Sequence, residues 1–263
     1  MKVFKIGRLA ATAVLTGAMT VVAGAPATAT EDPCAPRTVS ISDDYEVEGG
    51  PSGGRQLSFV LTTTGCAAGT IEYATTFTAS SSSPPALPPS DYTTVVGTVN
   101  WTRFGSSSVT VNVPIIGDDW VEMDENLTLV LRHPSSAITV TDGVGVGTIL
   151  NDDQTQVGAE SEPDCGMTAA TTCEFTLELS RRVAFDVSVA YATGNGTAGA
   201  GLEFVGVPSG IVVIPAGATR ATARISLMPG PVLGSSKYFY VDLTGTSVGT
   251  LAVSRLRLNI PAP

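Results

Sequence analysis

The sequence contains few aromatic and few charged residues, and only one histidine. Aromatic residues make up 6% of the 263 positions and charged residues 14%, and His133 is the single histidine. A Ser/His/Asp triad would depend on His133, whose neighbours Arg132 and Pro134 indicate the end of a strand. A glycosidase needs two closely spaced carboxylates with one raised pKa, and no pocket-lining aromatics accompany the acidic residues. We therefore expect no enzyme.

Basic residues are also scarce, and long apolar runs are confined to the first residues. The chain has 14 basic and 24 acidic residues, a net charge of −10, which argues against nucleic acid or anionic membranes as partners. Lys2, Lys5 and Arg8 precede an apolar run and a small-residue cleavage site at 27–29, as in a secretory signal peptide. No later run approaches the roughly 20 residues of a membrane span. We expect residues 1–29 to be removed and residues 30–263 to be secreted into the extracellular space.

Cysteine is limited to four residues, with no C-x-x-C redox motif among them. In an exported chain, Cys34, Cys66, Cys165 and Cys173 predict two structural disulfides, for which three connectivities are possible. Pairing nearest neighbours would join Cys34 to Cys66 and Cys165 to Cys173.

Thr, Ser, Val and Gly are abundant, a composition that favours strands with Gly and Pro turns. Residues 56–64 alternate apolar and polar side chains, as in a half-buried strand. An acidic, glycine-rich turn is expected at 43–50, and prolines should keep the loop 79–89 out of any ladder. The strands predicted for the first half are residues 38–42, 56–64, 70–77, 95–101, 107–116, 126–132 and 144–150.

The second half of the chain repeats the first. Tyr191-Ala192-Thr193 echoes Tyr73-Ala74-Thr75 at an offset of 118 residues, and Glu203-Phe204 echoes Asp91-Tyr92 at 112. A sustained offset of this length predicts a duplicated domain. We expect two β-sandwiches of seven strands each, one over residues 30–153 and the other over residues 154–263.

Acidic residues are concentrated in the first copy. Residues 37–153 hold 14 acidic and 4 basic residues, net −10, whereas residues 157–263 hold 8 and 7, net −1. Residues 118–125 alone pack five carboxylates into eight positions without a Lys or Arg. A cation would relieve their repulsion, and Ca²⁺ prefers six to eight such hard oxygen ligands. A merely solvated acidic turn is the alternative.

A set of motifs in the first copy makes the pattern more specific. In order, they are Glu48-Gly49-Gly50, Tyr73-Ala74-Thr75, Ser90-Asp91-Tyr92, Gly97-Thr98-Val99, residues 113–118, residues 122–127 and residues 147–153. This arrangement resembles a Calx-β domain, the repeat named for the regulatory loop of sodium–calcium exchangers. The resemblance covers residues 37–153 and continues in degenerate form over 157–260. It implies an all-β fold of two immunoglobulin-like antiparallel β-sandwiches in tandem, with Ca²⁺ held in loops at one end.

The resemblance also implies which residues would hold the ion. The implied ligands are Glu48, Asp91, Asp118, Glu122, Glu125, Asp152 and Asp153, with Asp119, Asp124 and Asn151 as weaker candidates. Exchanger-type members carry an additional Asp where this chain has Gly117, so we expect weaker binding and one or two ions.

The second copy lacks most of these ligands. Glu203 stands at the position of Asp91, residues 228–236 replace the acidic loop without any carboxylate, and residues 259–261 replace the closing acidic turn. We expect no calcium binding of the family's kind in this copy.

These observations predict a secreted calcium-binding tandem with a structural or adhesive role. Asp152 and Asp153 end the first domain, so a shared ion would stiffen both that domain and the interdomain joint. Trp101 is expected in the core, and Trp120 is expected to pack on the ion loop, with contact to a partner as the alternative for Trp120. An extracellular protein or polysaccharide is left open as a partner. The alternative is a metal-independent extracellular binding module, of adhesin, carbohydrate-binding or inhibitor type, with the loop 80–89 as its contact surface.

Overall fold

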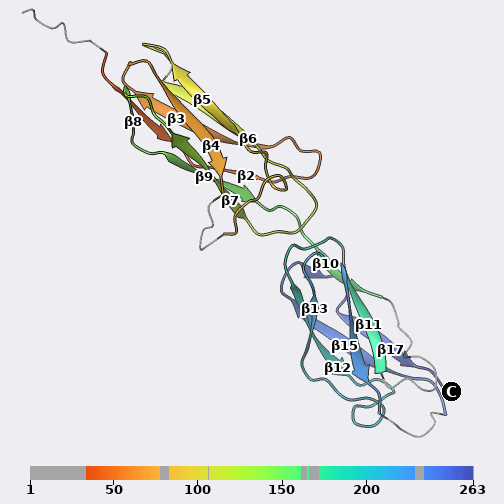
Figure 1. The fold of residues 1–263 in the computed structure, drawn as a ribbon. Helices are drawn as coiled ribbons and strands as arrows, with labels where there is room; N and C mark the ends of the chain where they lie inside the picture. The colour runs from red at the N-terminus through yellow and green to blue at the C-terminus, as the bar shows by residue number, and fades with distance from the viewer. Residues whose placement is uncertain are drawn as a thin grey trace, which may run out of the picture. The chain divides into compact units, whose positions relative to one another are not determined.

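The structure, a computed structural model, describes residues 34–77, 83–105, 107–160, 165, 172–228 and 234–262. The expected signal peptide lies outside the described residues, as do residues 78–82 of the Ser/Pro loop and 229–233 of the loop before the last long strand. Over the described ranges the regular elements are all β-strands (Figure 1). No helix in those ranges is long and apolar enough to cross a membrane.

The first sandwich is built from two sheets. Its strands are β1 (Arg37–Ile41), β2 (Asp44–Val47), β3 (Gln56–Thr64), β4 (Gly69–Thr76), β5 (Val96–Trp101), β6 (Ser108–Pro114), β7 (Glu125–Arg132), β8 (Ile138–Val140) and β9 (Val144–Leu150). One sheet has the order β6-β3-β1-β8 and the other the order β2-β9-β7-β4-β5. Most neighbours are antiparallel, as an immunoglobulin-like sandwich requires.

Three local expectations for this domain were wrong. The acidic segment after β1 is not only a turn, because Asp44–Val47 forms β2 and pairs in parallel with β9 in the opposite sheet. A short strand, β8, was missed and pairs in parallel with β1. The proline-rich loop does reach a ladder, because the Ala86 N–H donates to the Asn126 carbonyl at 2.9 Å. Prolines lack the donor, but the alanine between them has one.

Alternation along the strands builds the core of the first sandwich. In β3, Leu57, Phe59 and Leu61 are fully buried, while the residues between them face outward. Trp101, at the end of β5, is 4% exposed, as expected for a core residue. The core therefore follows the period of two that the sequence predicts.

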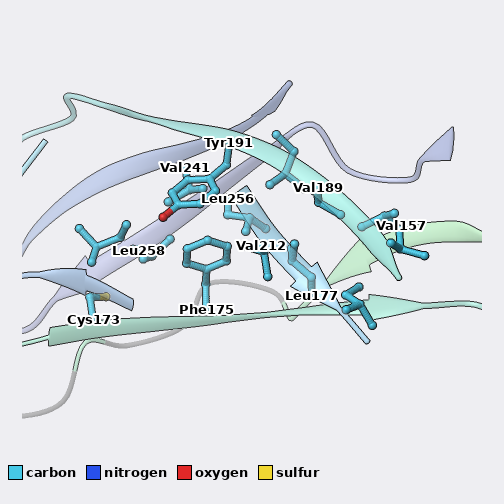
Figure 2. Packing of buried hydrophobic residues seen from close by; sticks show 14 of the residues in the cluster. Val157, Cys173, Phe175, Leu177, Val189, Tyr191, Val212, Val241, Leu256 and Leu258 are labelled. Carbon is cyan, nitrogen blue, oxygen red and sulfur yellow. The ribbon is translucent and has the colours of Figure 1, made fainter. Parts of the chain in front are cut away.

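The second sandwich repeats the two-sheet plan. Its strands are β10 (Gln156–Ala159), β11 (Thr172–Leu179), β12 (Val187–Gly194), β13 (Gly210–Ile214), β14 (Arg220–Ser226), β15 (Lys237–Thr246), β16 (Thr250–Leu251) and β17 (Arg255–Ile260). The sheets have the orders β14-β11-β10-β16 and β13-β12-β15-β17. Figure 2 shows Phe175 and Tyr191 meeting between the sheets, edge to face at 5.4 Å between ring centroids.

Two disulfides tie loops and strands together. Cys34 is bonded to Cys66 and Cys165 to Cys173, the nearest-neighbour pairing among the three possibilities. Residues Cys34–Pro263 form one compact unit. Contacts between the loop of residues 116–124 and the second sandwich therefore lie within this unit.

Candidate metal centre

The carboxylates predicted as ligands lie on four segments that are distant in the sequence. Glu48 follows β2, Asp91 lies in the loop before β5, and Glu125 begins β7. Asp118 and Glu122 belong to the loop between β6 and β7, which we call the metal loop (residues 116–124), and Asp152 and Asp153 follow β9. The parallel pairing of β2 with β9 brings the first and last of these segments side by side.

Asp91, Glu122 and Glu125 form the centre of the cluster. Each is half-buried and offers a carboxylate oxygen, and these oxygens lie within 4.8 Å of one another. Burial, followed by the hydrogen bond and charge of Asp91, raises the pKa of Glu125 to about 8. Burial and the charge of Asp91 raise the pKa of Glu122 to about 7. Hard oxygens at this spacing, sharing uncompensated charge, suit a divalent cation.

Glu48 extends the cluster toward the metal loop. It is 5% exposed, and burial followed by the charge of Asp118 raises its pKa to about 7. Its Oε1 accepts a hydrogen bond from the Asp118 N–H at 3.2 Å, and Asp118 Oδ1 accepts one from the Trp120 N–H at 2.6 Å. Both carboxylates therefore also accept hydrogen bonds that shape the metal loop.

Asp152 and Asp153 lie at the border of the cluster. Asp152 is exposed, and its Oδ1 accepts a hydrogen bond from the Gly49 N–H at 3.2 Å. Asp153 Oδ1 accepts one from Arg181 at 2.5 Å, whereas its Oδ2 is buried without a hydrogen-bond partner among the described residues. Burial raises the pKa of Asp153 although Arg181 opposes the shift. A buried carboxylate oxygen without a donor is costly, and a cation at this position would remove that cost. The residues present therefore fit a calcium ion.

The three weaker candidates have mainly other contacts. Asp119 has a side chain that is 66% exposed and pairs with Arg181 at 3.0 Å. Asp124 is exposed and accepts a hydrogen bond from the Asn151 N–H. Asn151 Oδ1 accepts one from the Glu122 N–H at 3.0 Å, and its Nδ2 donates to the Asp153 carbonyl. Asn151 thus holds the metal loop against the end of β9.

Gly117 explains why the metal loop can lie so close to the turn after β2. A Cβ on Gly117 would be 1.9 Å from the Gly49 carbonyl oxygen and 2.9 Å from that of Glu48. Gly49 itself has a positive φ of 74°, which glycine adopts without strain. The missing carboxylate at Gly117 is therefore also a packing requirement of this chain.

In the second sandwich a lysine stands at the position that corresponds to Glu125, a predicted ligand of the first sandwich. Lys237 begins β15 as Glu125 begins β7, at the same offset of 112 residues that relates Glu203 to Asp91. The Lys237 ammonium pairs with the Glu203 carboxylate. The Gly199 N–H, and then Lys237, lower the pKa of Glu203. An ammonium group thus balances the carboxylate charge at the equivalent position.

Sequence reasoning missed the contacts between the metal loop and the second sandwich. Val121 is 3% exposed and belongs to the hydrophobic core of the second sandwich. Its N–H donates to the Arg182 carbonyl at 2.9 Å, and its carbonyl accepts from the Ala184 N–H at 3.0 Å. Arg181 reaches back to Asp119 and Asp153. The presence of a valine within an acidic run was the available signal for Val121.

The linker between the sandwiches is itself packed. Thr155 is 1% exposed, and its hydroxyl donates to the Arg181 carbonyl at 3.2 Å. The single histidine, His133, is exposed, and its Nδ1 lies 2.8 Å from Glu72 Oε2. This agrees with its expected position at the end of a strand.

Comparison with known proteins follows the same division of the chain. The sequence profile described as the Calx-beta domain matches residues 53–149 and again residues 150–257. A search of curated proteins returns no match.

Several solved structures of Calx domains are similar to this chain. CBD12 from CALX1.2 is 15% identical, with 85% of this chain and 99% of that chain covered, at a TM-score of 0.38. The calcium binding domain CBD12 of CALX1.1 is 16% identical over 84% and 98%, at 0.37. The apo-form Calx CBD1 domain is 25% identical over 41% and 97%, at 0.36. Because the family profile matches most of the sequence in two successive copies, the chain belongs to the Calx-beta family.

Proposed function

We propose that the first sandwich binds Ca²⁺ through Glu48, Asp91, Asp118, Glu122, Glu125, Asp152 and Asp153, and that the protein has a secreted, structural or adhesive role. Calx-beta domains are typically calcium-binding. The observation that carries the proposal is the convergence of Asp91, Glu122 and Glu125 within 4.8 Å. Burial and the neighbouring carboxylates raise the pKa of both glutamates, which supports a site where a cation would relieve crowded acids.

The chemistry of the site favours Ca²⁺ over Mg²⁺. Every proposed ligand is a carboxylate, and the set comes from four separate segments rather than from one rigid element. Ca²⁺ accepts six to eight oxygens in flexible geometry, whereas Mg²⁺ demands a near-ideal octahedron and retains its waters. One or two calcium ions would account for the proposed ligand set.

Calcium would act on the joint between the domains as well as on the first domain. The metal loop carries the proposed ligands Asp118 and Glu122 and also Val121, which is buried in the second core. Asp153 lies at the same border and binds Arg181. Holding these residues around an ion would restrain the position of the second sandwich. We therefore propose that calcium stiffens the joint between the two domains.

The two disulfides support a location of the protein outside the cytoplasm, because such bonds persist in oxidising compartments. Secretion through residues 1–29 belongs to the same proposal. The family assignment supports a binding role rather than an enzymatic one.

Replacing Glu122 by Gln tests this proposal against a metal-independent module. The change keeps the shape of the side chain and removes a central negative charge, so we expect loss of most of the calcium-induced rise in thermal stability. Glu72→Gln is the matched control in the same domain, because Glu72 is 54% exposed and contacts His133. An unchanged calcium response in Glu122→Gln would contradict the ligand assignment, and a wild-type protein without any response would favour the metal-independent module.

A further inference from the structure

A hollow of about 420 Å³ lies where the metal loop meets the second sandwich. It is lined by Asp119, Trp120, Ser180, Arg181, Arg182 and Thr219. The first two residues come from the metal loop, the next three follow β11, and Thr219 precedes β14. Its size falls within the range of about 300–1,000 Å³ that is usual for small-molecule sites.

Trp120 gives this hollow its apolar surface. The indole is partly exposed, and its six-membered ring lies over the backbone of Gly217, where even a Cβ would come within 3.7 Å. The guanidinium of Arg182 lies 5.5 Å from the indole centroid, a cation–π arrangement that positions its donors. Trp120 therefore contributes the exposed part of its apolar ring to the hollow, with the Arg182 guanidinium over the ring and Gly217 near its edge.

The remaining groups of the hollow are hydrogen-bonding groups. Arg181 is neutralised by Asp119 and Asp153. Arg182 has no ion-pair partner within the part of the chain that the structure describes. Ser180 and Thr219 add hydroxyl groups, and Asp119 is 66% exposed with one oxygen on Arg181. Donors and acceptors thus surround a single aromatic surface.

We propose that this hollow binds a neutral oligosaccharide. The apolar C–H face of a sugar ring matches an aromatic surface, and its hydroxyl groups match arginine, carboxylate and hydroxyl partners. Polyanionic chains are disfavoured, because the first domain has a net charge of −10 over residues 37–153 and its carboxylate cluster adjoins the hollow. The hollow itself carries balanced charge in Arg181 with Asp119, and one further cation.

This inference rests on the proposed function in one respect. Asp119 and Trp120 belong to the loop that calcium would hold, while Arg182 and Thr219 belong to the second sandwich. A saccharide that contacts both the metal loop and the second sandwich binds best when calcium holds the metal loop in place. Calcium is therefore expected to tighten saccharide binding, and the saccharide to tighten calcium binding by the same factor.

Intrinsic fluorescence provides the test. The chain has two tryptophans, and Trp101 is 4% exposed, so an added ligand should alter the emission of Trp120. The probes are cellohexaose, xylohexaose, laminarihexaose and N-acetylated chitohexaose, each titrated to about 5 mM in calcium, since affinities near 1 mM are measurable there. We expect at least one probe to give a saturable change, with binding weaker by tenfold or more in EDTA.

Calorimetric titration of the variants with that probe locates the site. Trp120→Ala and Arg182→Ala are each expected to weaken binding by at least tenfold, while Arg220→Ala, which removes an outer-face ion pair with Glu178, should not. Arg182 is exposed, so its variant tests the site even if Trp120→Ala fails to fold. No response to any probe, or binding by both variants that is as tight as binding by the unchanged protein, would overturn the inference. A normal calcium shift without saccharide binding overturns this inference alone, whereas saccharide binding without a calcium shift overturns the proposed function alone.

Discussion

Three buried or half-buried acids, Glu48, Glu122 and Glu125, link the stability of the metal-free first domain to pH. Burial is the largest cause of the raised pKa in all three, and neighbouring carboxylates add to it. The pKa values of about 7, 7 and 8 compare with an ordinary value of 4.5. The folded protein therefore binds protons more tightly than the unfolded chain does.

This difference predicts how pH affects the metal-free protein. Stabilisation by the protonated glutamates is fully present below about pH 4.5 and is lost as the pH rises through 7 to 8. One pKa unit corresponds to about 1.4 kcal/mol, and three acids that share one site should together contribute on the order of 3 kcal/mol. Urea unfolding in EDTA should show a lower free energy of unfolding at pH 8.5 than at pH 5.5.

Glu125→Gln serves as the control for this pH dependence. It removes the group with the highest raised pKa, so the decline between the two pH values should become smaller. Calcium should reverse the trend, because protons compete with the ion for the same oxygens. A metal-free protein that becomes more stable as the pH rises would contradict the electrostatic description of the cluster.

At the scale of elements, Gly117 lets the metal loop pack closely against the turn after β2. Gly117→Ala is expected to destabilise the first domain by about 1–3 kcal/mol, because the new Cβ would overlap the Gly49 carbonyl and force the backbone apart. Calcium affinity should fall as well, since Glu48 adjoins the displaced segment. Thermal unfolding and calcium titration measure both effects.

Gly54→Ala is the matched control for Gly117→Ala. A Cβ at Gly54 meets nothing within 4 Å, so its effect on stability should stay within about 0.5 kcal/mol. Equal stability of the two variants would show that the metal loop does not lie against the turn after β2.

Strands with a regular alternation of buried and exposed side chains could be predicted from the sequence, whereas short strands with parallel partners could not. Period-two alternation identified β3 and β6 because their inward side chains pack on one core. The change of sheet between β1 and β2 and the short strand β8 escaped prediction. Both depend on parallel pairing with strands about 100 residues away, and a short strand carries little periodicity of its own.

Some features of the candidate site could be predicted from the sequence, and others depend on how the domains pack. Acidic residues in a dense run are visible in the sequence, and the family resemblance indicated which distant carboxylates would join them. The burial of Val121 in the other domain and the position of Arg181 depend on how the two sandwiches pack. Lys237 was visible in principle, because the offset of 112 residues aligns it with Glu125. That Lys237 neutralises a carboxylate at this position is known only from its ion pair with Glu203 in the structure.

At the scale of the whole molecule, the metal loop and Arg181 connect the two sandwiches. Val121→Ala removes buried volume from the second core although the residue belongs to the first domain. We expect the second domain to lose about 1–2 kcal/mol. In Arg181→Ala the carboxylate of Asp153 loses its cationic partner, so the unfolding transitions of the two domains should separate in calcium.

Calorimetry of both variants measures this coupling. Arg220→Ala is the control, because its partner Glu178 lies on the outer face of the second sandwich and exposed ion pairs contribute little. If Val121→Ala changed only the transition of the first domain, the connection through the metal loop would be wrong.

The most direct test of calcium binding is thermal unfolding of residues 30–263 after EDTA treatment, followed by addition of Ca²⁺ or, separately, Mg²⁺. For a Kd of ~10 μM and ~1 mM free ion, Ca²⁺ should stabilise the first domain by about 2.7 kcal/mol. Mg²⁺ should have little effect, because the ligand set suits a larger, more flexibly coordinated ion. Identical unfolding curves in EDTA, Ca²⁺ and Mg²⁺ would contradict the proposal that the acidic cluster is a calcium site.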